Sequence, residues 1–128
     1  PTRSVAGVTW RWPTRGEVTR EFDAGAARKG ILIAGQNGQS IRAAASGQVV
    51  YSGNGLIGYG ELIIIKHSER MLSAYAHNRE RLVAEGDRVG AGSLIARMGV
   101  NERSENVLHF EIRRDGKPTN PMDYLPQR

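Results

Sequence analysis

Short apolar stretches, separated by glycines and polar turns, run along most of the chain. Strands are expected wherever β-branched residues dominate such a stretch. The expected strands are Glu17–Phe22, Ile31–Ala34, Ser40–Ala43, Gly47–Ser52, Glu61–Lys66, Met71–Tyr75, Ser93–Met98 and Val107–Arg113. No segment shows convincing helical periodicity; Asn78–Val83 is at most one helical turn, and Met122–Leu125 is a closing turn. The pattern predicts an all-β fold of short strands.

Length and glycine content support one compact β domain. The 128 residues and 14.0 kDa suffice for one buried core. The 16 glycines lie between the apolar stretches, which is typical of strands joined by tight turns. We expect residues 1–11 to be a partly ordered N-terminal extension with an untethered end over 1–6, and residues 12–128 to form the domain.

Charge and composition narrow the classes of function. Lys and Arg total 18 against 13 for Asp and Glu, which gives a net charge of +5 and favours an acidic partner. No cysteine is present, so thiolate zinc sites and cysteine nucleophiles are excluded. The positive charge is diffuse and no recognition helix is predicted, which argues against nucleic acid. Because the chain starts at Pro1, we expect a missing N-terminal part that could carry an anchor.

Three histidines are candidates for chemistry. His109 and Glu111 share one face of an alternating strand, while His77 and His67 each end another expected strand. A structural role is the simpler interpretation for any one histidine taken alone. Arg79 and Arg81, in the polar stretch that follows His77, are expected to be solvated.

Six short motifs follow one another in a recognisable order. They are Lys29–Ala34, Ala45–Tyr51, Gly58–Gly60, Ser73–His77, Glu85–Val89 and Leu108–Ile112. In this order and spacing they resemble LytM domains, the M23 zinc endopeptidases of bacterial cell walls, from about Trp12 to Leu125. The resemblance implies a mainly β fold in which two antiparallel sheets form a central groove, as in duplicated hybrid motifs.

The zinc ligands of active family members are largely replaced. Those members bind zinc through His-x-x-x-Asp and the second histidine of a later His-x-His. When the sequence is aligned on Gly30, Arg28 replaces the histidine and Leu32 the aspartate of the first motif. Val107 replaces the first histidine of the second motif. Neither guanidinium nor alkyl groups offer a lone pair to a metal. His109 is the one remaining ligand and His77 the one remaining catalytic histidine. We therefore expect both to be vestigial, with no metal, cofactor or enzymatic activity.

A groove without metal has the composition of a protein-binding surface. The candidate groove residues are Arg28, Lys29, Leu32, Tyr59, Leu62, Val107, His109 and Arg113. The resemblance implies a non-catalytic activator that relieves the autoinhibition of a periplasmic zinc N-acetylmuramoyl-L-alanine amidase while peptidoglycan is split in cell division. It also implies tethering to the outer membrane through an N-terminal lipoprotein region.

Alternatives stay open at the level of the sequence. A peptidoglycan-binding module without activity, or residual metal-dependent hydrolysis, would use the same groove. Leu32 and Val107 are equally compatible with filling the core, and Tyr59 with packing on the sheet as a turn residue.

Overall fold

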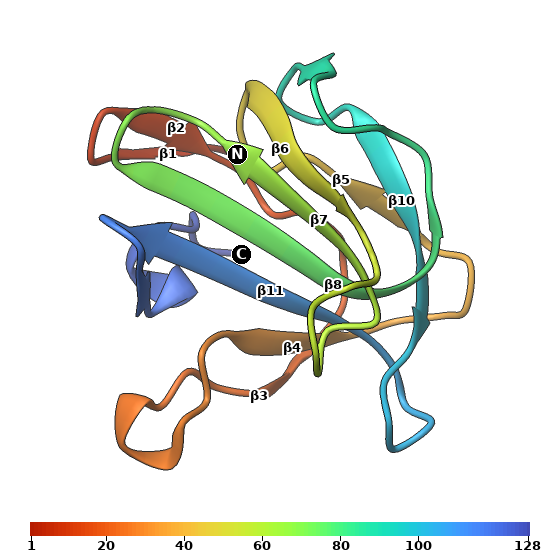
Figure 1. Ribbon diagram of the computed structural model, residues 1–128. Helices are drawn as coiled ribbons and strands as arrows, with labels where there is room; N and C mark the ends of the chain where they lie inside the picture. The colour runs from red at the N-terminus through yellow and green to blue at the C-terminus, as the bar shows by residue number, and fades with distance from the viewer.

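Residues 1–128, all of which are described here, form an almost entirely β structure in a computed structural model (Figure 1). The strands are β1 (Arg3–Val5), β2 (Val8–Trp10), β3 (Val18–Arg20), β4 (Ile31–Ala34), β5 (Ser40–Arg42), β6 (Gly47–Gly53), β7 (Glu61–Lys66), β8 (Met71–Arg81), β9 (Arg88–Val89), β10 (Leu94–Val100), β11 (Asn106–Arg114) and β12 (Lys117–Thr119). Two single 3-10 turns complete the chain, η1 (Ala24–Ala26) and η2 (Pro121–Asp123). The predicted all-β class is confirmed. Neither helical turn has the length or apolarity to cross a membrane.

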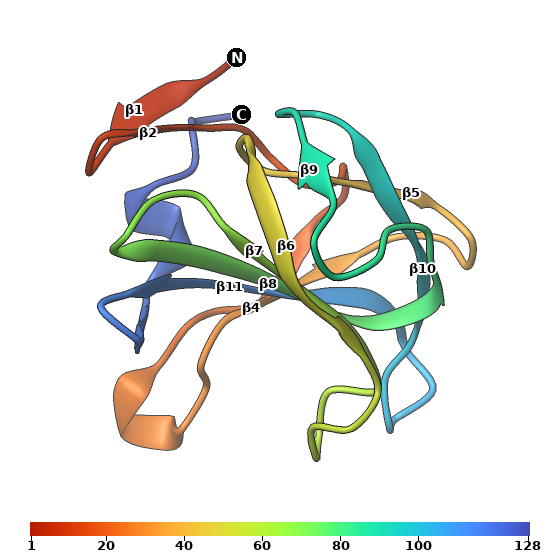
Figure 2. The same ribbon diagram turned by 45° about the horizontal axis from the view of Figure 1, so that its top comes forward.

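The strands form one large antiparallel sheet and one small one. The large sheet has ten strands in the order β3-β4-β11-β10-β8-β7-β6-β9, with β12 added at β11 and β5 at β10. The small sheet is the β1-β2 hairpin. Figures 1 and 2 show β7, β8 and β11 side by side at the centre of the molecule. Residues on these central strands are therefore held by pairing on both sides.

Strand β8 changes its pairing partner halfway along. Met71–Ala76 pair with β11, whereas Asn78–Arg81 pair with β10. His77 lies between the two segments with φ of 67°, which is uncommon for a residue with a side chain. The expectation of at most a helical turn over Asn78–Val83 was wrong. Its polar sequence has no apolar alternation, and only pairing with β10 makes it a strand.

The main core lies around three large aromatic side chains. Trp10, Tyr75 and Phe110 are fully buried, and the rings of Tyr75 and Phe110 lie 5.3 Å apart. The buried Tyr75 hydroxyl accepts hydrogen bonds from the Ala44 N–H (2.9 Å) and from the Ser73 hydroxyl (2.7 Å). Burial raises the pKa of Tyr75 to about 12, so the phenol stays neutral and stabilises the core as a satisfied polar group.

His67 belongs to this core and has a structural role. Its Nδ1 contacts the Ser46 carbonyl at 2.8 Å and its Nε2 contacts the Ser73 hydroxyl at 2.7 Å. The imidazole also packs edge-on against Trp10, with ring centroids 5.0 Å apart. Burial lowers the pKa of His67. Both ring nitrogens are engaged, which agrees with the simpler interpretation of this histidine.

The N-terminal residues form a hairpin that packs on the core. Strands β1 and β2 pair through a turn in which Ala6 and Gly7 both have positive φ, as two-residue hairpin turns require. Val8 and Trp10 join the main core, and the Trp10 indole donates to the Val5 carbonyl at 3.1 Å. The expectation of an untethered end over residues 1–6 was wrong. The division between 1–11 and 12–128 stays a prediction.

Candidate functional site

A cleft of about 270 Å³ opens at one end of the central strands. Three connections surround it: residues 21–30 between β3 and β4, residues 54–60 between β6 and β7, and residues 101–105 between β10 and β11. Side chains from β4, β8 and β11 form its floor, among them Leu32, His77 and His109. Rigid paired strands therefore supply the floor, and loops supply the rim.

The pairing register brings the two family motifs together on this floor. His109 on β11 lies directly opposite Leu32 on β4 and opposite Ala76 on β8. The His77 and His109 rings are 6.1 Å apart. Just before β4, a Cβ on Gly30 would lie 2.3 Å from the Phe110 carbonyl oxygen, so only glycine fits this close approach. Gly30 therefore sets how closely the residues before β4 approach β11.

Glu111 is the most deeply buried charged group of the site. Its side chain is 0% exposed, and its two oxygens accept hydrogen bonds from His109 Nε2 and from Arg113 Nε, each at 2.7 Å. Arg113 also donates through Nη2 to the Tyr59 hydroxyl at 3.1 Å, and the Tyr59 ring packs edge-on against His109. The network fixes Tyr59 and His109 relative to each other.

This network sets the charges of its members. Burial alone would raise the pKa of Glu111, but the hydrogen bonds and charges of His109 and Arg113 lower it, so the carboxylate is ionised. The same ion pair outweighs burial and raises the pKa of Arg113, while burial and the Glu111 charge raise the pKa of Tyr59. Because an ionised carboxylate only accepts hydrogen bonds, His109 Nε2 must carry a proton.

His77 connects the floor to the rim of the cleft. Its backbone N–H donates to the Tyr59 carbonyl at 3.0 Å, and its Nε2 lies 3.9 Å from the Glu102 carboxylate. Burial lowers the pKa of His77, the neighbouring His109 lowers it further, and Glu102 opposes both effects. The imidazole is therefore neutral at pH 7.

The connection between β3 and β4 carries cations to the rim. Asp23 caps η1 by accepting hydrogen bonds from the Gly25 and Ala26 N–H groups, and its backbone pairs with that of Arg28. This closed turn places Arg28 and Lys29 beside the floor. Neither side chain forms an ion pair; the ion pairs of the molecule use other cations. The rim thus has positive charge available for a partner.

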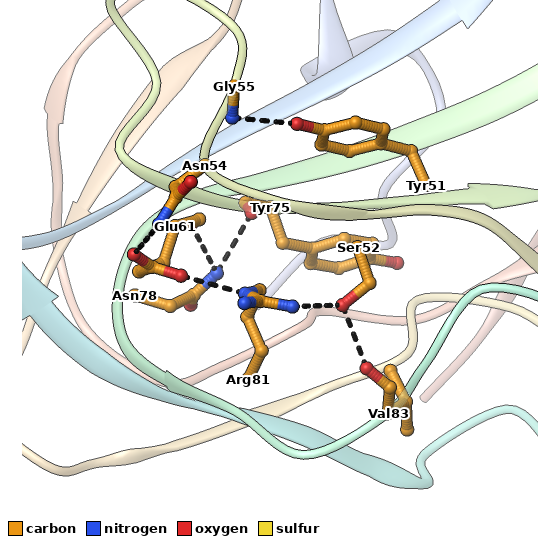
Figure 3. A network of polar contacts seen from close by, with 9 residues as sticks. All are labelled: Tyr51, Ser52, Asn54, Gly55, Glu61, Tyr75, Asn78, Arg81 and Val83. Atoms are coloured by element: carbon orange, nitrogen blue, oxygen red, sulfur yellow. Dashed lines mark hydrogen bonds and ion pairs between the residues drawn. The ribbon is translucent and has the colours of Figure 1, made fainter.

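A second polar network anchors the connection between β6 and β7 (Figure 3). Glu61 accepts from Arg81 Nε at 2.7 Å and from Asn54 Nδ2 at 3.0 Å, and Arg81 also donates to the Ser52 hydroxyl at 2.8 Å. At the start of the loop, the Tyr51 hydroxyl accepts from the Gly55 N–H at 2.9 Å. The expectation that Arg81 is merely solvated was therefore wrong.

Two apolar side chains stand at the tip of this anchored loop. Ile57 is 99% exposed and Leu56 is 45% exposed, and Ile57 lines the cleft. Burial of these two side chains against a partner would be favourable. The networks of Figure 3 hold the ends of the loop, so the tip is presented in a defined position.

The structure divides the eight predicted groove residues into three groups. Five of them line the cleft: Arg28, Lys29, Leu32, Tyr59 and His109. Arg113 does not line the cleft, but it donates hydrogen bonds to Tyr59 and Glu111, which do. Leu62 and Val107 are only 1% and 4% exposed, so the expectation that they face a partner is corrected: apolar side chains at these positions pack inward, Leu62 beneath Tyr59.

Among the residues that line the cleft, sequence reasoning did not identify Arg20, Ile57 and Glu102. Glu111 was placed on the same strand face as His109 from the alternation of β11, but it was not counted among the groove residues. Ile57 gave no signal, because an exposed loop isoleucine and a buried one look alike in the sequence. Arg20 and Glu102 depend on which loops meet in space.

The residues at the family's zinc positions do not fit a zinc ion. Arg28 and Leu32 offer no lone pair, and Nε2 of His109 is bound to Glu111. No group of three or more His, Cys, Asp or Glu side chains is placed to hold a metal ion.

The family model of peptidase family M23 matches residues 26–121, which includes the cleft. The chain belongs to this family. It is 58% identical over 121 residues to the murein hydrolase activator NlpD of Escherichia coli, covering 94% of this chain and 32% of the relative. It is also 54% identical over 131 residues to the lipoprotein NlpD/LppB homolog of Pseudomonas aeruginosa, covering 99% and 44%.

A solved structure shares this fold. Csd3 of Helicobacter pylori superposes with a TM-score of 0.83 at 26% identity, over 98% of this chain and 35% of that one. The chain thus spans less than half of the length of these relatives. Membership of peptidase family M23, the antiparallel β fold and the similarity to NlpD activators are therefore established for this domain.

Proposed function

We propose that this domain is a non-catalytic activator of a cell-wall hydrolase, and that its partner is a periplasmic zinc N-acetylmuramoyl-L-alanine amidase. One observation carries the proposal: the floor of the M23 cleft holds Leu32 opposite a His109 that is bound to Glu111, where active members hold zinc. A catalytic zinc needs three protein ligands and an open position. The similarity to proteins named murein hydrolase activators supports the same conclusion.

The chemistry of the cleft fits a segment with both acidic and apolar side chains. Arg28, Lys29 and Arg20 supply cations that have no carboxylate partner within the molecule. Tyr59 and Ile57 supply aromatic and apolar contact area beside them. A cleft with basic and apolar walls is suited to one face of an amphipathic helix. Such a helix is what an autoinhibited amidase would have to release.

Activation then follows from differential binding. The cleft binds the open amidase, whose helix is free, and not the closed one, so binding shifts the population towards the open enzyme. A shift from 1% to 99% open requires a difference of about 10⁴-fold in affinity, or about 5.5 kcal/mol. A few aromatic and ionic contacts in a preformed cleft can supply this difference.

The proposed location is the periplasm, where peptidoglycan and its amidases meet. The Pseudomonas aeruginosa relative, which is 54% identical to this domain, is named a lipoprotein and is more than twice its length. We therefore place the domain in a longer envelope protein, with tethering to the outer membrane through an N-terminal lipid anchor.

Dye release from labelled peptidoglycan tests the proposal. Three reactions are compared: the domain alone, the amidase alone, and both together. The domain alone is expected to release nothing, and the mixture is expected to release dye at least tenfold faster than the amidase. Dye release by the domain alone, or an unchanged rate in the mixture, would overturn the proposal.

A further inference from the structure

A second concave surface lies beside the connection between β4 and β5 and shares no residue with the cleft. It encloses about 860 Å³ and is lined by four arginines, Arg15, Arg42, Arg97 and Arg128. No aspartate or glutamate lines it. This basic concavity, as we call it here, gathers guanidinium groups from four separate segments of the chain.

None of these four arginines is neutralised within the molecule. The arginines that form ion pairs are Arg70, Arg81 and Arg113, all outside the basic concavity. Placing like charges around one hollow is unfavourable, and a bound anion would offset the repulsion.

Backbone carbonyl groups hold several of the guanidinium groups in place. Arg42 donates to the Gly92 carbonyl at 3.1 Å, Arg128 donates to the Thr14 carbonyl at 2.6 Å, and Arg97 contacts the Ser40 hydroxyl at 3.3 Å. A carbonyl engages only some of the five N–H donors of an arginine. The remaining donors are positioned to bind an anion with little loss of side-chain entropy.

Neutral polar groups complete the surface. The amides of Gln36, Asn37 and Gln39 line it, together with the Trp12 indole, over which Arg128 lies at 3.7 Å. None of the large exposed apolar side chains of the protein takes part. A membrane-binding surface would present apolar side chains to the lipid, so this composition favours a hydrated polymer that carries both anions and hydrogen-bonding groups.

We propose that the basic concavity binds peptidoglycan itself, through the carboxylates of its stem peptides. Guanidinium forks match carboxylates in bidentate geometry, and the amides suit the hydroxyl and acetamido groups of the glycan. Because the two surfaces share no residue, the domain can hold the cell wall while the cleft is free for the hydrolase. The inference concerns a different surface from the proposed function and does not depend on it.

Co-sedimentation with purified sacculi, in the absence of any amidase, tests this site. Arg15→Glu combined with Arg42→Glu changes two exposed side chains of the concavity. Arg88→Glu combined with Arg114→Glu is the matched control, because it makes the same change in net charge at exposed positions outside both surfaces. Circular dichroism and melting temperature verify that each variant is folded.

The expected result is binding of the parent that weakens on the order of tenfold in the concavity variant and less than twofold in the control. The parent should bind sacculi with amidated carboxylates as weakly as the concavity variant binds unmodified sacculi. Equal losses in both variants would show attraction by net charge alone and overturn the site. Undiminished binding to amidated sacculi, or stronger binding to anionic phospholipid vesicles, would overturn the proposed ligand. The proposal also fails if a folded concavity variant, either Arg15→Glu with Arg42→Glu or Arg15→Gln with Arg42→Gln, binds sacculi as well as the parent does.

Discussion

Glu111 holds the residues of the cleft floor together. A carboxylate with no exposure is tolerated because His109 and Arg113 donate hydrogen bonds to both of its oxygens and Arg113 also balances its charge. The same bonds engage the one histidine left from the family's ligand set. A buried ion pair thus occupies this part of the cleft, and Tyr59 is oriented by it.

Replacing Glu111 with glutamine should destabilise the domain by about 2 kcal/mol, because Arg113 would lose a charged partner in a buried setting. Urea denaturation at pH 7 measures the change in the free energy of unfolding. Glu80→Gln is the control, since Glu80 is exposed and its side chain has no partner. A loss below about 0.5 kcal/mol for Glu111→Gln would show that the ion pair is unimportant to the fold.

Acid should destabilise the protein in two stages. Burial lowers the pKa of His77 and of His67 below the ordinary 6.5, so the unfolded chain takes up these protons first and stability declines as the pH falls below about 6.5. The pKa of Glu111 is lowered from 4.5, so its contribution is present above pH 4.5 and is lost as the pH falls further. Urea midpoints from pH 8 to pH 3 measure both stages; Glu111→Gln should flatten the second. Equal stability of the parent at pH 4 and pH 7 would contradict this account.

The alternation of apolar residues, together with the turn residues between the apolar stretches, predicted most of the strands. β4, β7 and the expected strand over Val107–Arg113 agree with the structure, because their apolar residues alternate or run continuously. The second half of β8 was missed because its residues are polar and only pairing with β10 defines it. β1 and β2 were missed because an Ala-Gly turn is a weak hairpin signal.

The cleft was harder to predict than the strands. Positions on β4 and β11 followed from alternation and the family motifs, whereas Val107 and Leu62 could not be placed without the packing. The loops that form the rim meet only in the folded molecule. Loop positions such as Ile57 therefore remained invisible in the sequence.

The loop tip between β6 and β7 should act as an apolar anchor for the partner. Ile57→Ser is expected to lower activation about tenfold, because truncating an anchor costs about 1–2 kcal/mol of binding. Stability should not change, since Ile57 is 99% exposed. Leu82→Ser, which removes another exposed apolar side chain away from the cleft, should leave activation unchanged. Full activation by a folded Ile57 variant would remove the loop from the interface.

The whole molecule is an M23 fold with two separate concave surfaces, the cleft and the basic concavity, for each of which we propose a ligand. Both surfaces carry cationic side chains, and the net charge of +5 belongs to the whole chain, so charge alone predicted an acidic partner without locating it. The fold explains why the chain resembles a peptidase, and the side chains of the cleft explain why we propose that it is not one.

Restoring the family's ligands should not restore a peptidase. In the triple variant Arg28→His, Leu32→Asp and Val107→His, Glu111 still engages His109 and a buried position receives an imidazole. We expect less than one zinc ion per chain after dialysis, by elemental analysis, and little peptidoglycan cleavage. Stoichiometric zinc with vigorous cleavage would show that the catalytic geometry has been retained.

Charge reversal at the rim of the cleft is the sharpest test of our proposal that the cleft activates an amidase. Arg113→Glu is unsuitable, because it would place a second carboxylate beside the buried Glu111. Arg28→Glu with Lys29→Glu changes two exposed side chains that form no ion pair, and Arg88→Glu with Arg114→Glu is the matched control. Dye release with a fixed amount of amidase is measured for the parent and both variants. We expect the rim variant to lose at least tenfold of the activation while the control keeps it; a folded rim variant that activates as well as the parent would refute the proposal.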